Sequence, residues 1–188
     1  MQAGEALGIA PFGVEAQRLL RLEKGHVIIG QDTDAMTTPM ELDMGWALAW
    51  KKPFFLGKRT LQDLEKIGQP RKLIGFTIKT TGSLVPKESH LLIDDKQDKM
   101  IGRVTSCAYS PVLSQIVGLA LLEDLSKSET GSLIKIRCDG GGLVDATVTA
   151  APFYDPENQR QKPDDSFINE TTGTFSPVSA SQPEPPGR

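Results

Sequence analysis

The chain has 188 residues, of which 38% are hydrophobic and 24% charged, and its formal net charge is -3. These values are typical of a globular protein of one domain, or one domain and a fraction, that is long enough to bury a core. No apolar run approaches the roughly 20 residues that span a bilayer. No basic segment followed by an apolar run opens the chain. We therefore expect neither a membrane-spanning helix nor a secretory signal.

The excess negative charge lies at the end of the chain. From residue 155 onward there are six acidic and three basic residues, whereas residues 1–154 carry 18 of each. A neutral body offers no broad electrostatic attraction for nucleic acid or an anionic membrane. The two cysteines, Cys107 and Cys138, could form one disulfide, but two reduced, buried thiols in a cytoplasmic protein are the favoured interpretation.

The first part of the chain mixes helical, turn and extended signals. Residues 11–24 are predicted as a helix, because Pro11 fits a first turn, leucines recur at helical spacing, and Gly25 is a natural stop. Residues 26–30 form a short apolar run, which predicts a strand. A second helix is predicted over residues 58–66, just before a glycine.

A linker at residues 69–71, which carries Pro70, marks a boundary after this part. The six β-rich segments that follow are 73–78, 90–93, 102–105, 116–122, 133–137 and 143–149. Six short strands separated by turn residues predict an all-β barrel or sandwich. Residues 155–188 are rich in Pro, Ser, Thr and Gln, and we expect most of them to be disordered. The predicted fold class is α+β, with domains at 1–68 and 72–154.

The densest group of polar residues lies at 30–41. One interpretation is a polar loop, since Asp, Thr and Pro favour turns. The other is a binding site, because Glu41 is followed by apolar residues at positions 42, 44, 46 and 48. A carboxylate in such surroundings must find hydrogen-bond donors or shift its pKa. A heteroaromatic ligand with paired N–H donors would suit it.

Other motifs do not indicate chemistry. Residues 139–142 are glycine-rich but lack the spacing of a phosphate-binding loop, so a β-turn is expected. Asp32 and Asp34 resemble the start of a calcium loop, but the glycine and the closing glutamate are not at the required places. We expect no metal there. Cys107 has no obvious neighbouring base, which argues against a catalytic nucleophile.

Several short motifs, in order, resemble the folate-binding aminomethyltransferase family, which includes the glycine cleavage T-protein. They are Pro11–Ala16, Leu20–His26, Gly30–Asp32, Thr38–Pro39, Lys52–Lys58, Gly102–Ser106, Ser110–Pro111 and Pro152–Glu157. The resemblance covers about residues 8–160. Within the family, residues 25–34 and 153–157 are most similar to the C-terminal region of the alpha subunits of heterotetrameric sarcosine oxidases.

The resemblance implies a partial folate-binding α/β region at residues 1–68, followed by a complete, six-stranded antiparallel β-barrel at 72–154. The earlier half of the folate-binding region, with the catalytic aspartate of the family, is absent from this sequence. No residue here is therefore assigned a catalytic role, and whether the chain is itself an enzyme stays open. Capture of a one-carbon unit would need that acid.

The resemblance also implies residues that bind tetrahydrofolate. The glutamate of the Thr-Pro-x-Glu motif, here Glu41, would accept paired hydrogen bonds from the pterin. The turn formed by Gly30, Gln31 and Asp32 would help to shape the pocket. The tryptophans at positions 46 and 50, Trp46 and Trp50, would wall it. Relatives often carry a tyrosine where this chain has isoleucine at position 29. Lys87 alone could replace a basic residue that relatives contribute from the barrel.

The function implied by the resemblance is transfer of a one-carbon unit from sarcosine oxidation to tetrahydrofolate. Flavin and NAD are expected only in partner regions or subunits, and flavoprotein subunits of a sarcosine oxidase complex are the expected protein partners. A second hypothesis is a truncated, non-catalytic assembly or binding module, whose missing half would leave an apolar patch exposed. The third is a β-barrel with no ligand site of its own.

Overall fold

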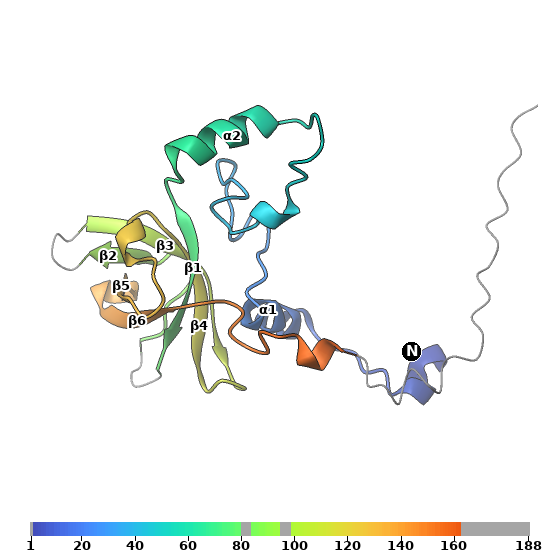
Figure 1. Ribbon diagram of the computed structural model, residues 1–188. Coiled ribbons are helices and arrows are strands. Elements are labelled where there is room, and N and C mark those ends of the chain that lie inside the picture. Colours follow the sequence, from blue (N-terminus) through green and yellow to red (C-terminus); the bar gives the residue numbers. More distant parts are fainter. Residues whose placement is uncertain (1, 80–83, 95–98, 163–188) are drawn as a thin grey trace, which may run out of the picture. The chain divides into compact units, whose positions relative to one another are not determined.

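The computed structural model of the chain describes residues 2–79, 84–94 and 99–162. The chain divides into two units, Met1–Pro156 and Glu157–Arg188, of which the second contains the short 3-10 helix η5 (Gln159–Gln161). Disorder is predicted for most of residues 155–188. Of these, residues 163–188 lie outside the described residues. The first unit contains the α-helices and the β-strands of the described residues (Figure 1).

The two predicted helices are confirmed as α1 (Val14–Glu23) and α2 (Lys58–Ile67). The shorter 3-10 helices are η1 (Gln2–Leu7), η2 (Gly45–Ala47), η3 (Leu125–Lys127) and η4 (Asp139–Gly141). Helix α1 begins three residues later than predicted, because Gly13 is still extended at its N-cap. It ends at Glu23, and two residues later Gly25 has a φ of 67°, which glycine readily adopts and which stops the helix.

The strand predicted at residues 26–30 is wrong. The backbone N–H groups of Gln31 and Asp32 both donate to the carbonyl of Ile28, so the chain closes a turn. The backbone N–H of Ile28 in turn donates to the Asp32 carboxylate. This apolar run therefore satisfies its backbone polar groups locally and joins no strand.

The six predicted strands are confirmed. They are β1 (Lys72–Ile78), β2 (Leu91–Asp94), β3 (Lys99–Ser110), β4 (Gln115–Leu122), β5 (Leu133–Arg137) and β6 (Leu143–Thr149). They form a closed antiparallel barrel in the order β1-β4-β3-β2-β5-β6, and β6 pairs back onto β1, with Phe76 opposite Val148. Of the two predicted architectures, the barrel is the one found.

Strand β4 is buried on both faces, which explains its continuous apolar sequence. Ile116, Ala120 and Leu122 point into the barrel core, whereas Val117 and Leu119 pack outside it. The outer pair is covered by Leu22 of α1, which lies beside β4 (Figure 1). Strands covered on both sides lose the alternation of polar and apolar residues.

The segment that follows β6 fastens α1 to the barrel. The carbonyl of Glu23 accepts hydrogen bonds from the backbone N–H groups of Phe153 (2.9 Å) and Tyr154 (3.0 Å). The buried carboxylate of Glu23 accepts a hydrogen bond of 2.6 Å from the Ser110 hydroxyl of β3. Lys24 donates to the carbonyl of Asp155. The helix is thus held from its C-terminal end, and the loop that leaves it starts from a defined position.

Candidate functional site

Asp32 is the most enclosed charged group among the described residues, with 0% of its surface exposed. Its Oδ1 accepts hydrogen bonds from the hydroxyls of Thr105 (2.7 Å) and Ser106 (2.5 Å), both on β3. Its Oδ2 accepts from the Arg21 guanidinium of α1 (2.6 Å) and from the backbone of Ile28 (2.8 Å). We call Arg21, Asp32, Thr105 and Ser106 the Asp32 cluster. It joins a helix, a loop and a barrel strand.

Arg21 carries the positive charge of this cluster. Besides Asp32, it donates to the carbonyl of His26 (3.0 Å) and to the hydroxyl of Ser106 (2.7 Å). Its Nε is buried and has no hydrogen-bond partner among the described residues. Four donors already reach the two oxygens of Asp32, so this carboxylate positions the loop and has little capacity left for a ligand.

Glu41 is also buried, with 1% of its surface exposed, and both of its oxygens have partners. The backbone N–H of Thr38 donates to Oε2 (2.7 Å), and the guanidinium of Arg71 donates to Oε1 (2.8 Å). The backbone N–H of Glu41 donates to the Thr38 hydroxyl, which completes a reciprocal pair of the capping-box kind. The burial inferred from the sequence is therefore present, but its donors come from this chain. The predicted role as a pterin ligand stays a prediction.

Arg71, in the predicted linker, connects Glu41 to a second carboxylate. It donates to both oxygens of Asp34, at 2.9 Å and 3.4 Å. Hydrogen bonds from Arg71 and from Thr37 hold the pKa of Asp34 well below its usual range. The same bond to Asp34, followed by the one to Glu41, raises the pKa of Arg71. The guanidinium therefore stays charged and clamps the middle and the end of the polar loop, at Asp34 and Glu41, to the start of β1.

Gly30 and Gln31 form the outer turn of this loop. Gly30 has a φ of 91°, where an added side chain would strain the backbone. Gln31 donates to the Glu88 carboxylate (2.6 Å) and to the Ser106 hydroxyl (3.1 Å). The turn is thus attached to the Asp32 cluster through Ser106, while the backbone of Gly30 faces open space.

The remaining predicted site residues lie in other places. Trp46 is 82% exposed, whereas Trp50 packs against the ring of Phe55 with centroids 6.1 Å apart. Lys87 is exposed and forms an ion pair of 2.8 Å with Asp139. That pair raises the pKa of Lys87 and lowers the pKa of Asp139.

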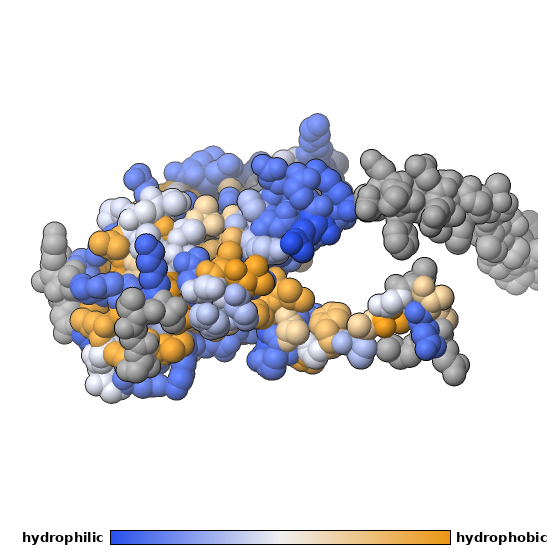
Figure 2. All heavy atoms as spheres, turned by 90° about the horizontal axis from the view of Figure 1, so that it is seen from below, coloured by the Kyte–Doolittle hydropathy of each residue, from blue (hydrophilic) through white to orange (hydrophobic). Residues whose placement is uncertain are grey.

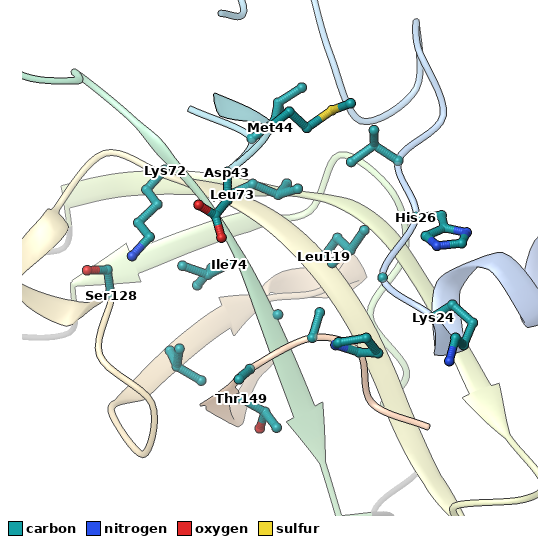
Figure 3. Close-up of a pocket in the computed structure, with 18 of the residues that line it drawn as sticks. Lys24, His26, Asp43, Met44, Lys72, Leu73, Ile74, Leu119, Ser128 and Thr149 are labelled. Atoms are coloured by element: carbon teal, nitrogen blue, oxygen red, sulfur yellow. The ribbon is translucent and has the colours of Figure 1, made fainter. Parts of the chain in front are cut away.

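A cavity of about 700 Å³ lies between the first part of the chain and the outside of the barrel. It is lined by residues 24–27 and 42–44, by the start of β1, and by residues 148–152 (Figure 3). Of the predicted site residues, only Trp46 contributes to its wall. Neither Asp32 nor Glu41 lines it. No local sequence pattern reports this cavity, because its wall combines segments far apart in the chain, such as residues 24–27 and 148–152.

The structure therefore brings together only part of the predicted site. Gly30, Gln31 and Asp32 share one network, whereas Glu41, Trp46, Trp50 and Lys87 have separate surroundings. Three residues with central contacts were missed: Arg21, Arg71 and Ser106. Of these, Arg21 carries a signal in the sequence, since it is the basic residue in the last turn of the predicted helix.

Other chemistries find little support in the structure. Burial raises the pKa of Cys107 to about 12, which disfavours a reactive thiolate. Both cysteines are free thiols. Within the described ranges, no group of three or more His, Cys, Asp or Glu residues is placed to hold a metal ion. No helix in the part of the chain that the structure describes is long and apolar enough to cross a membrane.

Comparison with known families gives two adjacent matches. Residues 1–52 match the GCVT N-terminal domain, and residues 71–155 match the glycine cleavage T-protein C-terminal barrel domain. The second range coincides with the six strands of the barrel. The first contains α1, the polar loop and the two cavity-lining segments at residues 24–27 and 42–44.

Curated relatives agree with these matches. An aminomethyltransferase of Halothermothrix orenii is 38% identical over 136 residues, which are 72% of this chain and 37% of the relative. A sarcosine oxidase subunit alpha of Corynebacterium sp. (strain U-96) is 33% identical over 165 residues, which are 85% of this chain and 17% of the relative. The chain thus spans well under half the length of either protein.

A solved structure shows the same fold. The glycine cleavage system aminomethyltransferase T from Bartonella henselae superposes with a TM-score of 0.67 over 75% of this chain and 38% of that protein, at 24% sequence identity. The barrel and the segment packed against it are therefore an arrangement found in an aminomethyltransferase. Together with the two family matches and the relatives, this places the chain in the glycine cleavage T-protein family.

Proposed function

We propose that the chain is the closing part of the folate-binding region and the C-terminal barrel of an alpha subunit of the sarcosine oxidase type. In that setting it would serve transfer of a one-carbon unit from sarcosine oxidation to tetrahydrofolate. The observation that carries the proposal is the similarity to sarcosine oxidase subunit alpha over 85% of this chain. Flavoprotein subunits would be its partners, and flavin and NAD would bind to those partner regions.

The residues present fit only part of a tetrahydrofolate site. A pterin presents N–H donors, and a buried carboxylate is the acceptor that suits them. The two buried carboxylates of the predicted site, Asp32 and Glu41, already accept hydrogen bonds from this chain. We therefore propose that these two carboxylates hold the polar loop in place. Folate would instead contact the exposed surfaces of Gly30, Gln31 and Trp46. The rest of the site would come from the part of the relatives that this chain does not match.

Binding of tetrahydrofolate tests this division of roles. We expect weak binding by the chain alone, and tighter binding once the unmatched part of the Halothermothrix orenii aminomethyltransferase is added as a separate fragment. In that mixture Gln31→Ala should weaken binding without lowering the melting temperature, whereas Glu41→Gln should lower the melting temperature. If Glu41→Gln abolished binding and left the melting temperature unchanged, Glu41 would be the residue that contacts the pterin.

Turnover tests the reaction itself. Sarcosine-dependent formation of methylenetetrahydrofolate should require the flavoprotein subunits and the unmatched part of the alpha subunit. The control is the same mixture without this chain. Turnover by the chain alone would contradict the proposal that it lacks the catalytic acid of the family.

A second candidate function, a non-catalytic assembly module, is favoured by exposed apolar side chains. Those exposed by at least 55% in the first 67 residues are Ile9, Phe12, Val14, Leu20, Ile29, Met36, Trp46, Phe54, Leu56 and Ile67. In the rest of the described chain only Val112 and Leu133 reach that exposure. Figure 2 shows orange, hydrophobic surface open to solvent between hydrophilic areas. Clustered exposure of this kind marks an interaction surface.

Association with the separate fragment tests this second function. Val14→Ser and Leu20→Ser change exposed positions of α1, so we expect them to weaken association in sedimentation velocity while the melting temperature is unchanged. Val112→Ser, at an exposed position between β3 and β4, is the matched control. Association that is insensitive to both α1 variants would remove this helix from the interface.

A further inference from the structure

The cavity beside the barrel has charged groups on its wall that the proposed folate function, which uses only Trp46 of this lining, does not assign. Its volume of about 700 Å³ lies in the range of small-molecule sites. Apolar side chains of Leu42, Leu73 and Leu119 contribute to its wall. Such walls favour a ligand with an apolar body, and a few polar groups then decide which ligand fits.

Two charged side chains of the lining are available to a ligand. The side chains of Lys72 and Asp43 form no hydrogen bond and no ion pair with another described residue, although the backbone N–H of Asp43 donates to the carbonyl of Met40. Lys24, in contrast, is engaged by Asp155, through a hydrogen bond to its carbonyl and an ion pair of 3.6 Å. His26 is the remaining titratable group on the wall.

The two available charges lie on the same side of the cavity. Figure 3 shows Lys72 reaching toward Ser128, with the Asp43 carboxylate on that side as well, while Lys24 and His26 lie on the opposite side. Asp43 has a φ of 58°, a conformation that non-glycine residues rarely adopt. Such backbone conformations are enriched at ligand sites.

A positive and a negative group in the wall of one cavity select against simple ions. A lone anion would be attracted by Lys72 and repelled by Asp43, and a lone cation would meet the reverse. A ligand that carries both charges satisfies both groups. We propose that this cavity binds a free α-amino acid with a large apolar side chain. Its carboxylate would contact Lys72, its ammonium group Asp43, and its side chain the leucine wall. The inference goes beyond the proposed function, because Lys72 and Asp43 are not predicted folate residues.

Calorimetric titration with three probes tests the proposal on the full chain. L-phenylalanine carries both charges, N-acetyl-L-phenylalanine lacks the ammonium group, and L-phenylalanine amide lacks the carboxylate. We expect L-phenylalanine to bind, and each derivative to bind roughly tenfold more weakly, the loss that follows from one charge-assisted hydrogen bond. Equal affinity for all three probes would overturn the proposal, and so would the absence of measurable binding of L-phenylalanine.

Two variants assign the contacts. Lys72→Met should weaken L-phenylalanine and its N-acetyl derivative but leave the amide unchanged. Asp43→Asn should weaken L-phenylalanine and the amide but leave the N-acetyl derivative unchanged, and asparagine tolerates the positive φ at this position. Lys66→Met and Asp63→Asn, which remove an exposed ion pair of α2, are matched controls that should change none of the three affinities.

The outcome is separable from that of the folate proposal. Titration of the two cavity variants with tetrahydrofolate, in the presence of the fragment described above, should give the wild-type affinity. If either variant unfolds, the three probes on the unmodified chain still decide the question. A pattern in which Lys72→Met and Asp43→Asn weaken all three probes equally would contradict the assigned contacts.

Discussion

The barrel and the segment before it are stabilised in different ways. The barrel closes on itself around a continuous apolar core that includes Phe76 and Leu92. The segment over residues 14–67 has two buried apolar side chains, Leu22 and Leu42, within the described ranges. In the same segment three carboxylates are buried, those of Glu23, Asp32 and Glu41. It is therefore held to the barrel by the apolar contact of Leu22 with β4 and by charged and hydrogen-bonded contacts, with almost no core of its own.

This difference predicts two levels of stability. Apolar burial provides most of the free energy of folding, whereas a buried ion pair is offset by desolvation and contributes mainly to a defined geometry. We expect the segment to open locally while the barrel stays folded. The reverse should not occur, because the segment has the barrel as its support.

The largest effect is expected in the barrel core. The ring of Phe76 is fully buried and fills the space above Gly118, where an added Cβ would clash with it. Phe76→Ala should lower the free energy of unfolding by about 3–5 kcal/mol. Urea denaturation measures this, with the exposed Leu133→Ala as the control. Similar losses for both variants would contradict the core described here.

The next effect separates the two regions. Asp32→Asn leaves the charge of Arg21 buried without its partner, and we expect a loss of about 3 kcal/mol in the local stability of the segment. Hydrogen exchange should show lower protection in α1 and the polar loop and unchanged protection in the barrel strands. Asp63→Asn on α2 is the surface control. A uniform loss of protection would mean that the two regions unfold together.

A smaller effect is expected at the second clamp. Glu41→Gln keeps the shape of the side chain but removes a charged acceptor from Arg71, so we expect a loss of about 1–2 kcal/mol. Combined with Arg71→Met, the two changes should be less than additive, because they remove the same contact. Additive effects in thermal or urea unfolding would show that the 2.8 Å contact contributes nothing measurable.

The smallest effect concerns pH. The pKa of Asp34 is lower in the folded chain than its usual value, chiefly through Arg71. The ionised carboxylate therefore stabilises the loop above about pH 4, and this contribution is lost as the pH falls further. Because Asp34 is more than one-third exposed, we expect less than about 1 kcal/mol. Hydrogen exchange of the loop between pH 5 and pH 3 should show this dependence, and Arg71→Met should abolish it.

The two regions also differ in how well the sequence predicts them. The last two strands were predicted with the boundaries found, at 133–137 and 143–149, because turn residues flank short β-rich runs. β3 extends to Ser110, five residues beyond its predicted end, since pairing with β4 continues through residues that do not alternate.

In the segment, the sequence indicated that Glu41 needs donors but could not name them. Arg71 is 30 residues away, and the partners of Asp32 on β3 are more than 70 residues away. Contacts at such distances follow from how the segment packs on the barrel, and no local pattern reports them. The apolar run at 26–30 misled for a different reason, because Asp32, just beyond it in the chain, accepts from the backbone N–H of Ile28 and closes a turn.

The closed order of the barrel also limits how a partner can attach. Each of the six described strands has two hydrogen-bonded neighbours, so no strand edge is free to accept an added strand. Any flavoprotein subunit or other protein that joins this chain at the barrel must therefore recognise side chains and loops. Single surface substitutions can therefore change the affinity of a partner for the barrel and leave the hydrogen bonds between its strands intact.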